Sequence, residues 1–180
     1  MSVQNPASVQ AAKPAEDISG DGASISSARL AQANINPETG LATDYLNHFN
    51  EAIMLLEMVS SCPECLEDFL AWQPMSYSEH FTASRFKDRQ IAITAYETAD
   101  PAARHSLDSI ADTMTAVLEA TRGAMRSGLP QSGMQILAGR AVAWLKPLIA
   151  RAGAAINGET GIDAAHPAVP QAVVDGLLKH

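Results

Sequence analysis

Apolar side chains recur at helical spacing in the segment from Pro37 to Val59. Successive members of this set lie three or four residues apart, and they are Leu41, Tyr45, Phe49, Ala52, Leu56 and Val59. At about 100° per residue, such a set falls on one face of a helix. Asn36 supplies a capping oxygen just before Pro37, and proline is favoured in the first turn of a helix. The pattern therefore predicts an amphipathic helix from Pro37 to Val59.

A second, shorter helix is predicted to begin near Ser61. This serine precedes Glu64 by three residues, the spacing of a capping box, in which each side chain accepts the other residue's backbone N–H. The buried side of this helix is expected to consist of Leu66, Phe69 and Leu70. The helix cannot continue past Pro74, because proline lacks the N–H that a helix interior uses.

The capping spacing recurs at Ser76 and Glu79 and predicts a third helix that runs to about Ala99. Its helical wheel carries apolar residues on two sides, with Tyr77, Phe81, Ile91, Ala92 and Ala95 on one side and Phe86 and Ile93 on the other. A helix that is apolar on two sides is covered on both of them. We therefore expect this third helix to be the central one.

Asp88 lies on an apolar side of the predicted third helix. A carboxylate that is buried there without a partner costs several kcal/mol, on the order of 3 to 5. We therefore expect Asp88 to pair with Arg85, with Arg89 or with an arginine from a neighbouring helix.

Two long helices are predicted in the second half of the chain. Asp100 and Pro101 form a cap-plus-proline start, and the helix that follows is expected to end at Gly128. Its apolar seam is Leu107, Ile110, Met114, Val117, Leu118, Thr121 and Met125. A fifth helix is predicted from about Ser132 to Ala155, with a kink at Pro147. Its buried side is expected to be Leu137, Ala141, Trp144, Leu145, Leu148 and Ala152.

The fold class that these elements predict is an all-α bundle of about four to five main helices. Residues 1–23 contain few large apolar side chains and are expected to form a disordered tail. Residues 24–155 are expected to form the bundle, and residues 156–180 a linker and a short amphipathic helix. The apolar positions of that short helix are Val173, Val174, Leu177 and Leu178. No segment alternates apolar and polar residues as a strand would.

The charge of the chain limits its possible partners. There are 12 Lys and Arg against 20 Asp and Glu, a net charge of −8, which disfavours binding to nucleic acid or to anionic lipid. No apolar run approaches the roughly 18 residues of a membrane span, and the first residues do not resemble a secretory signal. We therefore expect a cytoplasmic protein with no nucleic-acid or membrane partner.

Asp44, His48 and Glu51 are the first candidate site. They are spaced by four and three residues, which places them on one side of a helix. Carboxylates and imidazoles that point inward from several helices can hold a metal ion, and His80 is the candidate donor from a second helix. The commoner use of such residues is a polar margin of hydrogen bonds and ion pairs, so both interpretations stay open.

Cys62 and Cys65 are the second candidate site, and they are the only cysteines in the chain. A cysteine at a helix N-terminus favours the thiolate, so a dithiol switch is one interpretation, and metal binding together with a histidine is another. A redox fold of the thioredoxin kind would need strands around the pair, and none is predicted. The expectation from sequence is two small, packed side chains in a reducing compartment.

No motif identifies a reaction, a substrate or a cofactor. The glycines do not have phosphate-binding spacing, and no serine lies in a nucleophile-elbow sequence. We therefore interpret the chain as a protein-interaction or regulatory module, with a protein partner or self-association. The alternative is a helical bundle that binds a metal or a small molecule at Asp44, His48, Glu51 and His80, and an enzyme is one form of this alternative.

Overall fold

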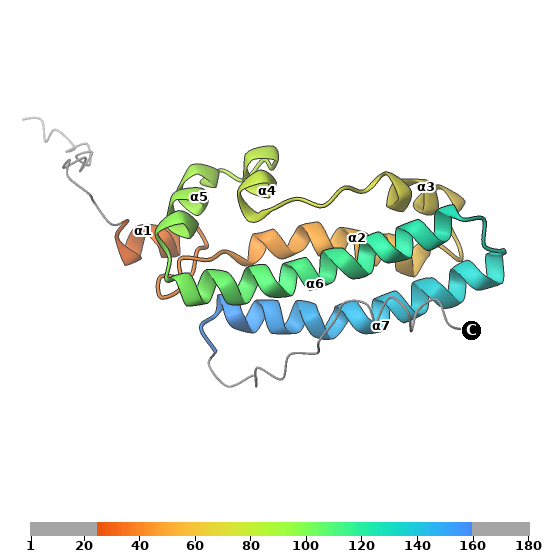
Figure 1. Cartoon of the computed structure of the whole chain (residues 1–180). Helices are drawn as coiled ribbons and strands as arrows, with labels where there is room; N and C mark the ends of the chain where they lie inside the picture. Colours follow the sequence, from red (N-terminus) through yellow and green to blue (C-terminus); the bar gives the residue numbers. More distant parts are fainter. Residues whose placement is uncertain (1–24, 160–180) are drawn as a thin grey trace, which may run out of the picture.

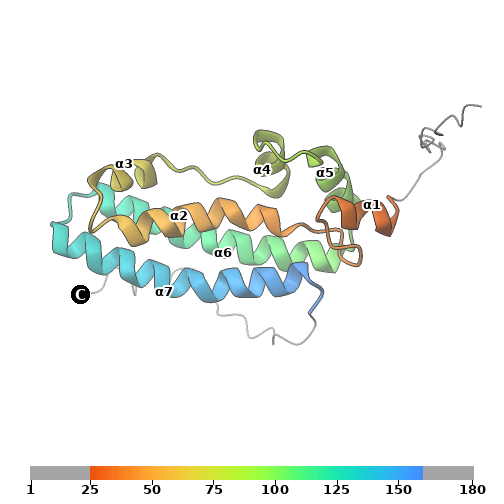
Figure 2. The ribbon, with the colours of Figure 1, turned by 180° about the vertical axis from the view of Figure 1, so that it is seen from behind.

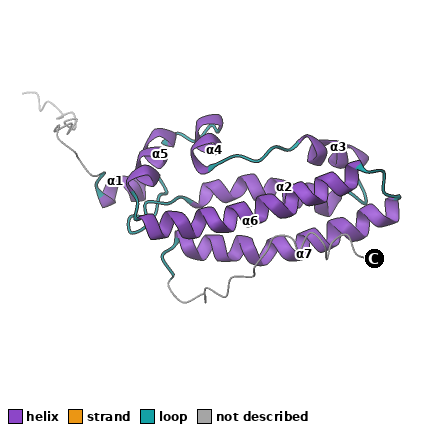
Figure 3. Cartoon of the chain, viewed as in Figure 1, coloured by secondary structure: helices purple, strands orange, loops and turns teal. Residues whose placement is uncertain are grey.

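The structure is a computed structural model that describes residues 25–159, and this part of the chain is helical without strands (Figure 1, Figure 3). The helices in chain order are α1 (Ser27–Gln32), the 3₁₀ helix η1 (Thr43–Tyr45), α2 (Leu46–Met58), α3 (Pro63–Ala71), α4 (Tyr77–Ala83), α5 (Arg89–Thr98), α6 (Pro101–Arg126) and α7 (Gln131–Ile156). The predicted all-α fold is confirmed. The expected tail at residues 1–23 and the short helix at 167–180 lie outside the described residues.

Three helices, α2, α6 and α7, lie side by side and form the body of the bundle (Figures 1 and 2). Helices α6 and α7 run in opposite directions and are joined by a short connection over residues 127–130. The shorter helices α3, α4 and α5 lie along one side of this body, and α1 lies beside α5 at one end. A bundle is therefore confirmed, with more and shorter helices than the sequence pattern predicts.

Helix α6 carries the apolar seam that the sequence predicts. Asp100 caps its first turn, because the Asp100 carboxylate accepts from the N–H groups of Ala102 and Ala103 at 2.8 and 3.1 Å. The buried residues of α6 include the whole predicted seam, namely Leu107, Ile110, Met114, Val117, Leu118, Thr121 and Met125. The hydroxyl of Thr121 donates to the carbonyl of Val117 at 2.7 Å, which satisfies its polar group inside the core. This helix is the one that the prediction placed most accurately.

The prediction of one helix from Pro37 to Val59 is wrong in its first part. Helical structure begins only at Thr43, and the α-helix proper is Leu46–Met58. Gly40 has a φ of +70°, a left-handed conformation that an α-helix does not contain. A Cβ at this position would lie 3.0 Å from the carbonyl oxygen of Ala95. Glycine therefore lets the chain turn and pass close to α5 before α2 begins.

The side-chain oxygen of Asn36 accepts from backbone N–H groups, as expected, but it does so in a turn and not at the start of a helix. Its Oδ1 accepts from the N–H groups of Glu38 and Thr39 at 2.8 and 3.2 Å, the geometry of an Asx turn. The hydroxyl of Thr39 then donates to the carbonyl of Ile156 at 2.6 Å, in a buried position at the end of α7. The segment before α2 thus caps a helix that lies more than a hundred residues further along the chain.

The predicted third helix is divided in two. Its capping box at Ser76 and Glu79 is present, but α4 ends at Ala83 and α5 begins at Arg89. In one unbroken helix Phe86 would lie almost opposite Phe81, whereas in the structure their rings are 5.2 Å apart between centroids. The break places both rings in the same apolar cluster. The two short helices lie at the edge of the bundle, so the expected central position is also wrong.

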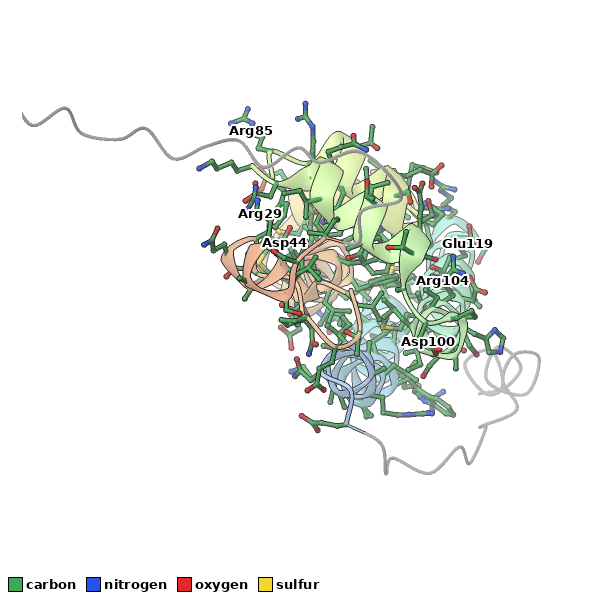
Figure 4. The ribbon with its side chains drawn as sticks, turned by 90° about the vertical axis from the view of Figure 1, so that its left-hand side faces the viewer. Arg29, Asp44, Arg85, Asp100, Arg104 and Glu119 are labelled. Carbon is green, nitrogen blue, oxygen red and sulfur yellow. A yellow bond between two sulfur atoms is a disulfide. The ribbon has the colours of Figure 1, made fainter. Side chains whose placement is uncertain are left out.

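Asp88 pairs with an arginine from a neighbouring helix. Its Oδ1 lies 2.6 Å from a guanidinium nitrogen of Arg29 in α1, and the side chains are 19% and 42% exposed respectively. Arg85 lies at the outer edge of the molecule in the view along the bundle (Figure 4). The expectation of an arginine partner is confirmed, and the half-exposed setting makes the pair weaker than a buried one.

Helix α7 runs without interruption through Pro147. Five of the six residues expected on its buried side are buried, but Trp144 is 45% exposed. Since α7 packs against both α2 and α6, its apolar residues extend beyond the face that these two helices cover.

Candidate functional site

The four residues proposed from the sequence come from two parts of the fold and meet beside one hollow. Asp44 lies in η1, His48 and Glu51 lie in α2, and His80 lies in α4. A hollow of about 210 Å³ is lined by Asn47, His48, Glu51, Met75, His80, Ala83 and Ser84, and we call it the His48–His80 hollow. The Asp44 carboxylate approaches the His80 ring that lines it. The structure therefore places His48, Glu51 and His80 on the wall of one hollow, with Asp44 beside His80.

His48 is buried, with 3% of its surface exposed, and its ring is stacked on one face and hydrogen-bonded at one edge. It stacks on the indole of Trp72 at 4.6 Å between centroids and 22° between planes. Its Nε2 accepts from the backbone N–H of Met75 at 3.2 Å. Since Nε2 is the acceptor, the proton of the neutral ring is on Nδ1.

Burial also determines the charge of His48. Loss of solvent, together with a smaller effect of the neighbouring His80, lowers the pKa of this imidazole from 6.5 to about 4. The two rings are 6.1 Å apart between centroids. At neutral pH His48 is therefore uncharged, and it acts as a fixed acceptor for the segment between α3 and α4.

His80 is the less satisfied of the two histidines. It is 9% exposed, and its Nε2 has no hydrogen-bond partner among the residues that the structure describes. The closest charged group is Oδ2 of Asp44, at 3.5 Å from this nitrogen. The other oxygen of Asp44 accepts from the side-chain amide of Asn47 at 3.0 Å. A buried nitrogen without a partner is rare in folded proteins and marks a place where a ligand atom would be stabilised.

The arrangement is incomplete as a metal centre. Within residues 25–159, no three His, Cys, Asp or Glu side chains are grouped closely enough to hold a metal ion. Glu51 is exposed, and His48 uses its unprotonated nitrogen to bind Met75. The pair closest to a binding geometry is therefore His80 with Asp44.

Sequence reasoning missed the residues that hold His48 in place. The indole Nε1 of Trp72 donates to the carbonyl of His48 at 3.3 Å. The guanidinium of Arg122, buried in α6, donates in turn to the carbonyl of Trp72. A buried arginine on the apolar side of a helix is a sequence signal for such a contact, because its charge has to find an acceptor.

The two cysteines form a disulfide, which corrects the expectation of two separate small side chains. Cys62 and Cys65 are joined with their Cα atoms 5.3 Å apart. Cys62, and not Ser61, is the N-cap of α3, and its sulfur accepts from the N–H of Cys65 at 3.2 Å. The hydroxyl of Ser61 instead donates to the carbonyl of Met58 at the end of α2.

The outer side of α7 carries two exposed large apolar side chains. Ile136 and Trp144 are 60% and 45% exposed. Beside Trp144, a groove of about 250 Å³ runs between α6 and α7, and its lining residues are Thr113, Val117, Ala143, Trp144, Pro147, Leu148 and Arg151. We call the exposed Ile136 and Trp144 together with this groove the α7 surface.

None of the helices in residues 25–159 combines the length and the apolarity needed to cross a membrane. Searches against protein-family models, against curated proteins and against solved structures return no match to this chain.

Proposed function

We propose that the protein binds a divalent transition-metal cation in the His48–His80 hollow, with His80 and Asp44 as its first ligands and Glu51 as a third. The observation that carries this proposal is the buried Nε2 of His80, which has no hydrogen-bond partner among the described residues. An imidazole nitrogen and carboxylate oxygens are common ligands of Zn²⁺ and similar cations.

The charge in the hollow favours a cation. The carboxylates of Asp44 and Glu51 lie at or beside the hollow, and burial keeps His48 neutral because its pKa falls to about 4. A bound cation would offset the two carboxylates without having to displace a proton from His48. Anionic ligands would meet the opposite field, so they are disfavoured.

Side chains must move for this site to close around a metal. The Asp44 side chain is 35% exposed and Glu51 is exposed, so both can rotate towards His80 at little cost in packing. His48 keeps its bond to Met75 and serves as a rigid wall of the hollow. Binding therefore requires the two carboxylates to reorient, while His48 keeps its hydrogen bond to Met75.

The test is a titration of protein that has been purified without an affinity tag and treated with a chelator. We expect Zn²⁺ to raise the melting temperature and to give a saturable signal in calorimetry, and His80→Ala and Asp44→Asn to weaken binding by more than about tenfold. His105→Ala is the matched control, because His105 is exposed on α6. Equal binding by the three variants, or none by the wild-type protein, would disprove the proposal.

A second candidate function is protein interaction, and the α7 surface favours it. Exposed apolar patches next to a groove are typical of interaction sites, and tryptophan is enriched where binding energy concentrates. We propose a second copy of this chain as the occupant. Helix α7 contains basic residues and no acidic one, whereas Asp112 and Glu119 are exposed on the neighbouring α6.

Opposite charges would therefore meet if α7 of one copy lay against the α6–α7 groove of the other, in an arrangement with twofold symmetry. We expect light scattering to detect a dimer whose dissociation constant rises by more than about tenfold in Trp144→Ala. Met54→Ala is the control, since Met54 is exposed on α2. A protein that stays monomeric at high concentration would exclude self-association through this surface.

A further inference from the structure

The disulfide between Cys62 and Cys65 encloses a single helical turn. The two residues are three positions apart, and the backbone between them is the first turn of α3. A disulfide stabilises a fold mainly by restricting the unfolded chain, and this effect is smallest for short loops. The link therefore does little to hold distant parts of the protein together.

Other contacts hold α3 in its place. Phe69 is fully buried, and at the other end of the helix the indole of Trp72 donates to the carbonyl of His48. The guanidinium groups of Arg122 and Arg126, both in α6, donate to the carbonyls of Trp72 and Leu70. These contacts do not involve sulfur, so α3 can stay docked whether the cysteines are joined or not.

The two sulfur positions differ in access. Cys62 is partly exposed at the N-cap, whereas Cys65 lies one turn into the helix and is 6% exposed. An incoming thiolate therefore has better access to Cys62 than to Cys65. This difference gives the disulfide a defined site of attack.

The position of Cys62 also stabilises its thiolate. The N–H of Cys65 lies 3.2 Å from the Cys62 sulfur, and the positive end of the α3 dipole points at it. One group acts in the opposite direction, since a carboxylate oxygen of Glu64 is 3.7 Å from the same sulfur. The helix N-terminus therefore raises the reactivity of the Cys62 sulfur, and the nearby carboxylate of Glu64 lowers it.

From these observations we propose that Cys62–Cys65 is a redox-active disulfide that exchanges with external dithiols. A thiolate of the dithiol attacks the sulfur of Cys62, the Cys62–Cys65 bond breaks, and Cys65 leaves as a thiolate that takes a proton from water. The second thiol of the same dithiol, as its thiolate, then attacks the dithiol sulfur of the mixed disulfide. The bond from that sulfur to Cys62 breaks, and Cys62 is released. Two electrons and two protons pass to the protein, and the dithiol becomes a cyclic or intramolecular disulfide.

The charge around the site selects among thiols. Glu64, Glu67 and Asp68 are all exposed on α3, so a negatively charged thiol such as glutathione is repelled. A neutral dithiol or a protein dithiol in a basic setting is favoured. We therefore expect dithiothreitol to reduce the site faster than glutathione does at equal thiolate concentration, with the difference decreasing as salt is added.

The first experiment measures the redox state of the folded full chain. The protein is equilibrated with mixtures of reduced and oxidised dithiothreitol, alkylated, and weighed by mass spectrometry, while circular dichroism records its helical content. We expect reversible two-electron reduction with unchanged helicity. A disulfide that opens only after the protein is unfolded in urea, or a reduction that abolishes the helical signal, would show a purely structural link and overturn the proposal.

The second experiment tests which sulfur reacts. In Cys65→Ser, Cys62 is expected to react with the neutral disulfide 4,4′-dithiodipyridine more than about tenfold faster than Cys65 does in Cys62→Ser. Adding Glu64→Gln to Cys65→Ser should raise the rate at neutral pH by about twofold or more, and Glu67→Gln, one turn further along, should not. Equal rates at the two cysteines, or no effect of Glu64→Gln, would contradict the assigned roles.

Discussion

The chemical state of His48 follows from what surrounds it. Its ring is stacked on Trp72, its Nε2 is occupied by the N–H of Met75, and burial lowers its pKa from 6.5 to about 4. In the unfolded chain the same imidazole takes up a proton near its ordinary pKa. Between these two values the unfolded state binds more protons than the folded state, so stability decreases as the pH falls.

This difference gives a prediction for acid stability. Between pH 7 and about pH 4.5, His48 should remove roughly 2 to 3 kcal/mol from the free energy of unfolding. Urea unfolding at a series of pH values measures this loss. In His48→Gln, which keeps an acceptor but cannot titrate, the decrease should be smaller by that amount. Identical pH profiles for the two proteins would mean that His48 is already solvated in the folded state.

The pair of Asp88 and Arg29 gives a second prediction. Because Arg29 is 42% exposed, water screens the attraction, and Asp88→Ala should cost only about 0.5 to 1 kcal/mol. The sequence alone places Asp88 on a buried side and suggests a loss of about 2 to 4 kcal/mol. A double-mutant cycle with Arg29→Ala isolates the coupling, which should decrease in high salt. A coupling above about 2 kcal/mol would show a pair that is shielded from solvent.

Part of the candidate site was predictable at this scale. Asp44, His48 and Glu51 share one side of the chain by helical spacing, and His80 follows the capping signal of Ser76 closely enough to be placed at a helix start. The tautomer of His48 was not predictable. It depends on the N–H of Met75, which lies in a nonhelical connection whose path no local pattern determines.

Helix starts show how a local signal can be satisfied in two ways. Ser76 and Glu79 form the complete capping box of α4. Ser61 and Glu64 have the same spacing, but the hydroxyl of Ser61 donates to the carbonyl of Met58, because the chain turns there to leave α2. The three-residue spacing of Ser and Glu therefore does not by itself predict which serine caps a helix.

The difference between the two serines is testable. We expect Ser76→Ala to lower the free energy of unfolding by about 1 kcal/mol, since it leaves the N–H of Glu79 without its acceptor. Ser61→Ala is the matched control and should change stability by less than about 0.5 kcal/mol. Chemical unfolding of both variants provides the comparison, and equal effects would mean that Ser61 also caps a helix.

The predicted helix boundaries are wrong where the contact that determines them comes from a distant part of the sequence. Gly40 turns the chain because α5 passes close to it at Ala95. Phe86 leaves the helical pattern so that its ring can meet Phe81. By contrast, α6 was predicted almost to the residue, because its cap, its seam and its end are all local.

At the scale of the molecule, α6 connects the long helix α7 with the short helix α3. It packs along α7 and also contacts α3. Met114, near the middle of its seam, is fully buried. Met114→Ala should therefore destabilise the protein by about 2 to 5 kcal/mol, measured as a shift of the urea midpoint. Met54→Ala, at an exposed position of α2, should cost less than about 0.5 kcal/mol. Similar losses for both would place Met114 outside the core.

The packing of α2 on α7 has a consequence for the chain during its synthesis on the ribosome. Helix α2 packs on α7, and Thr39, just before α2, caps the carbonyl of Ile156 at the end of α7. On the ribosome α2 emerges before α7, and the part of its surface that α7 covers stays uncovered until residues 131–156 have followed it. A nascent chain of this length is open to association with chaperones or with other chains for several seconds, about 5 to 20 residues being added each second. Synthesis of α7 therefore marks the point at which this part of α2 becomes protected.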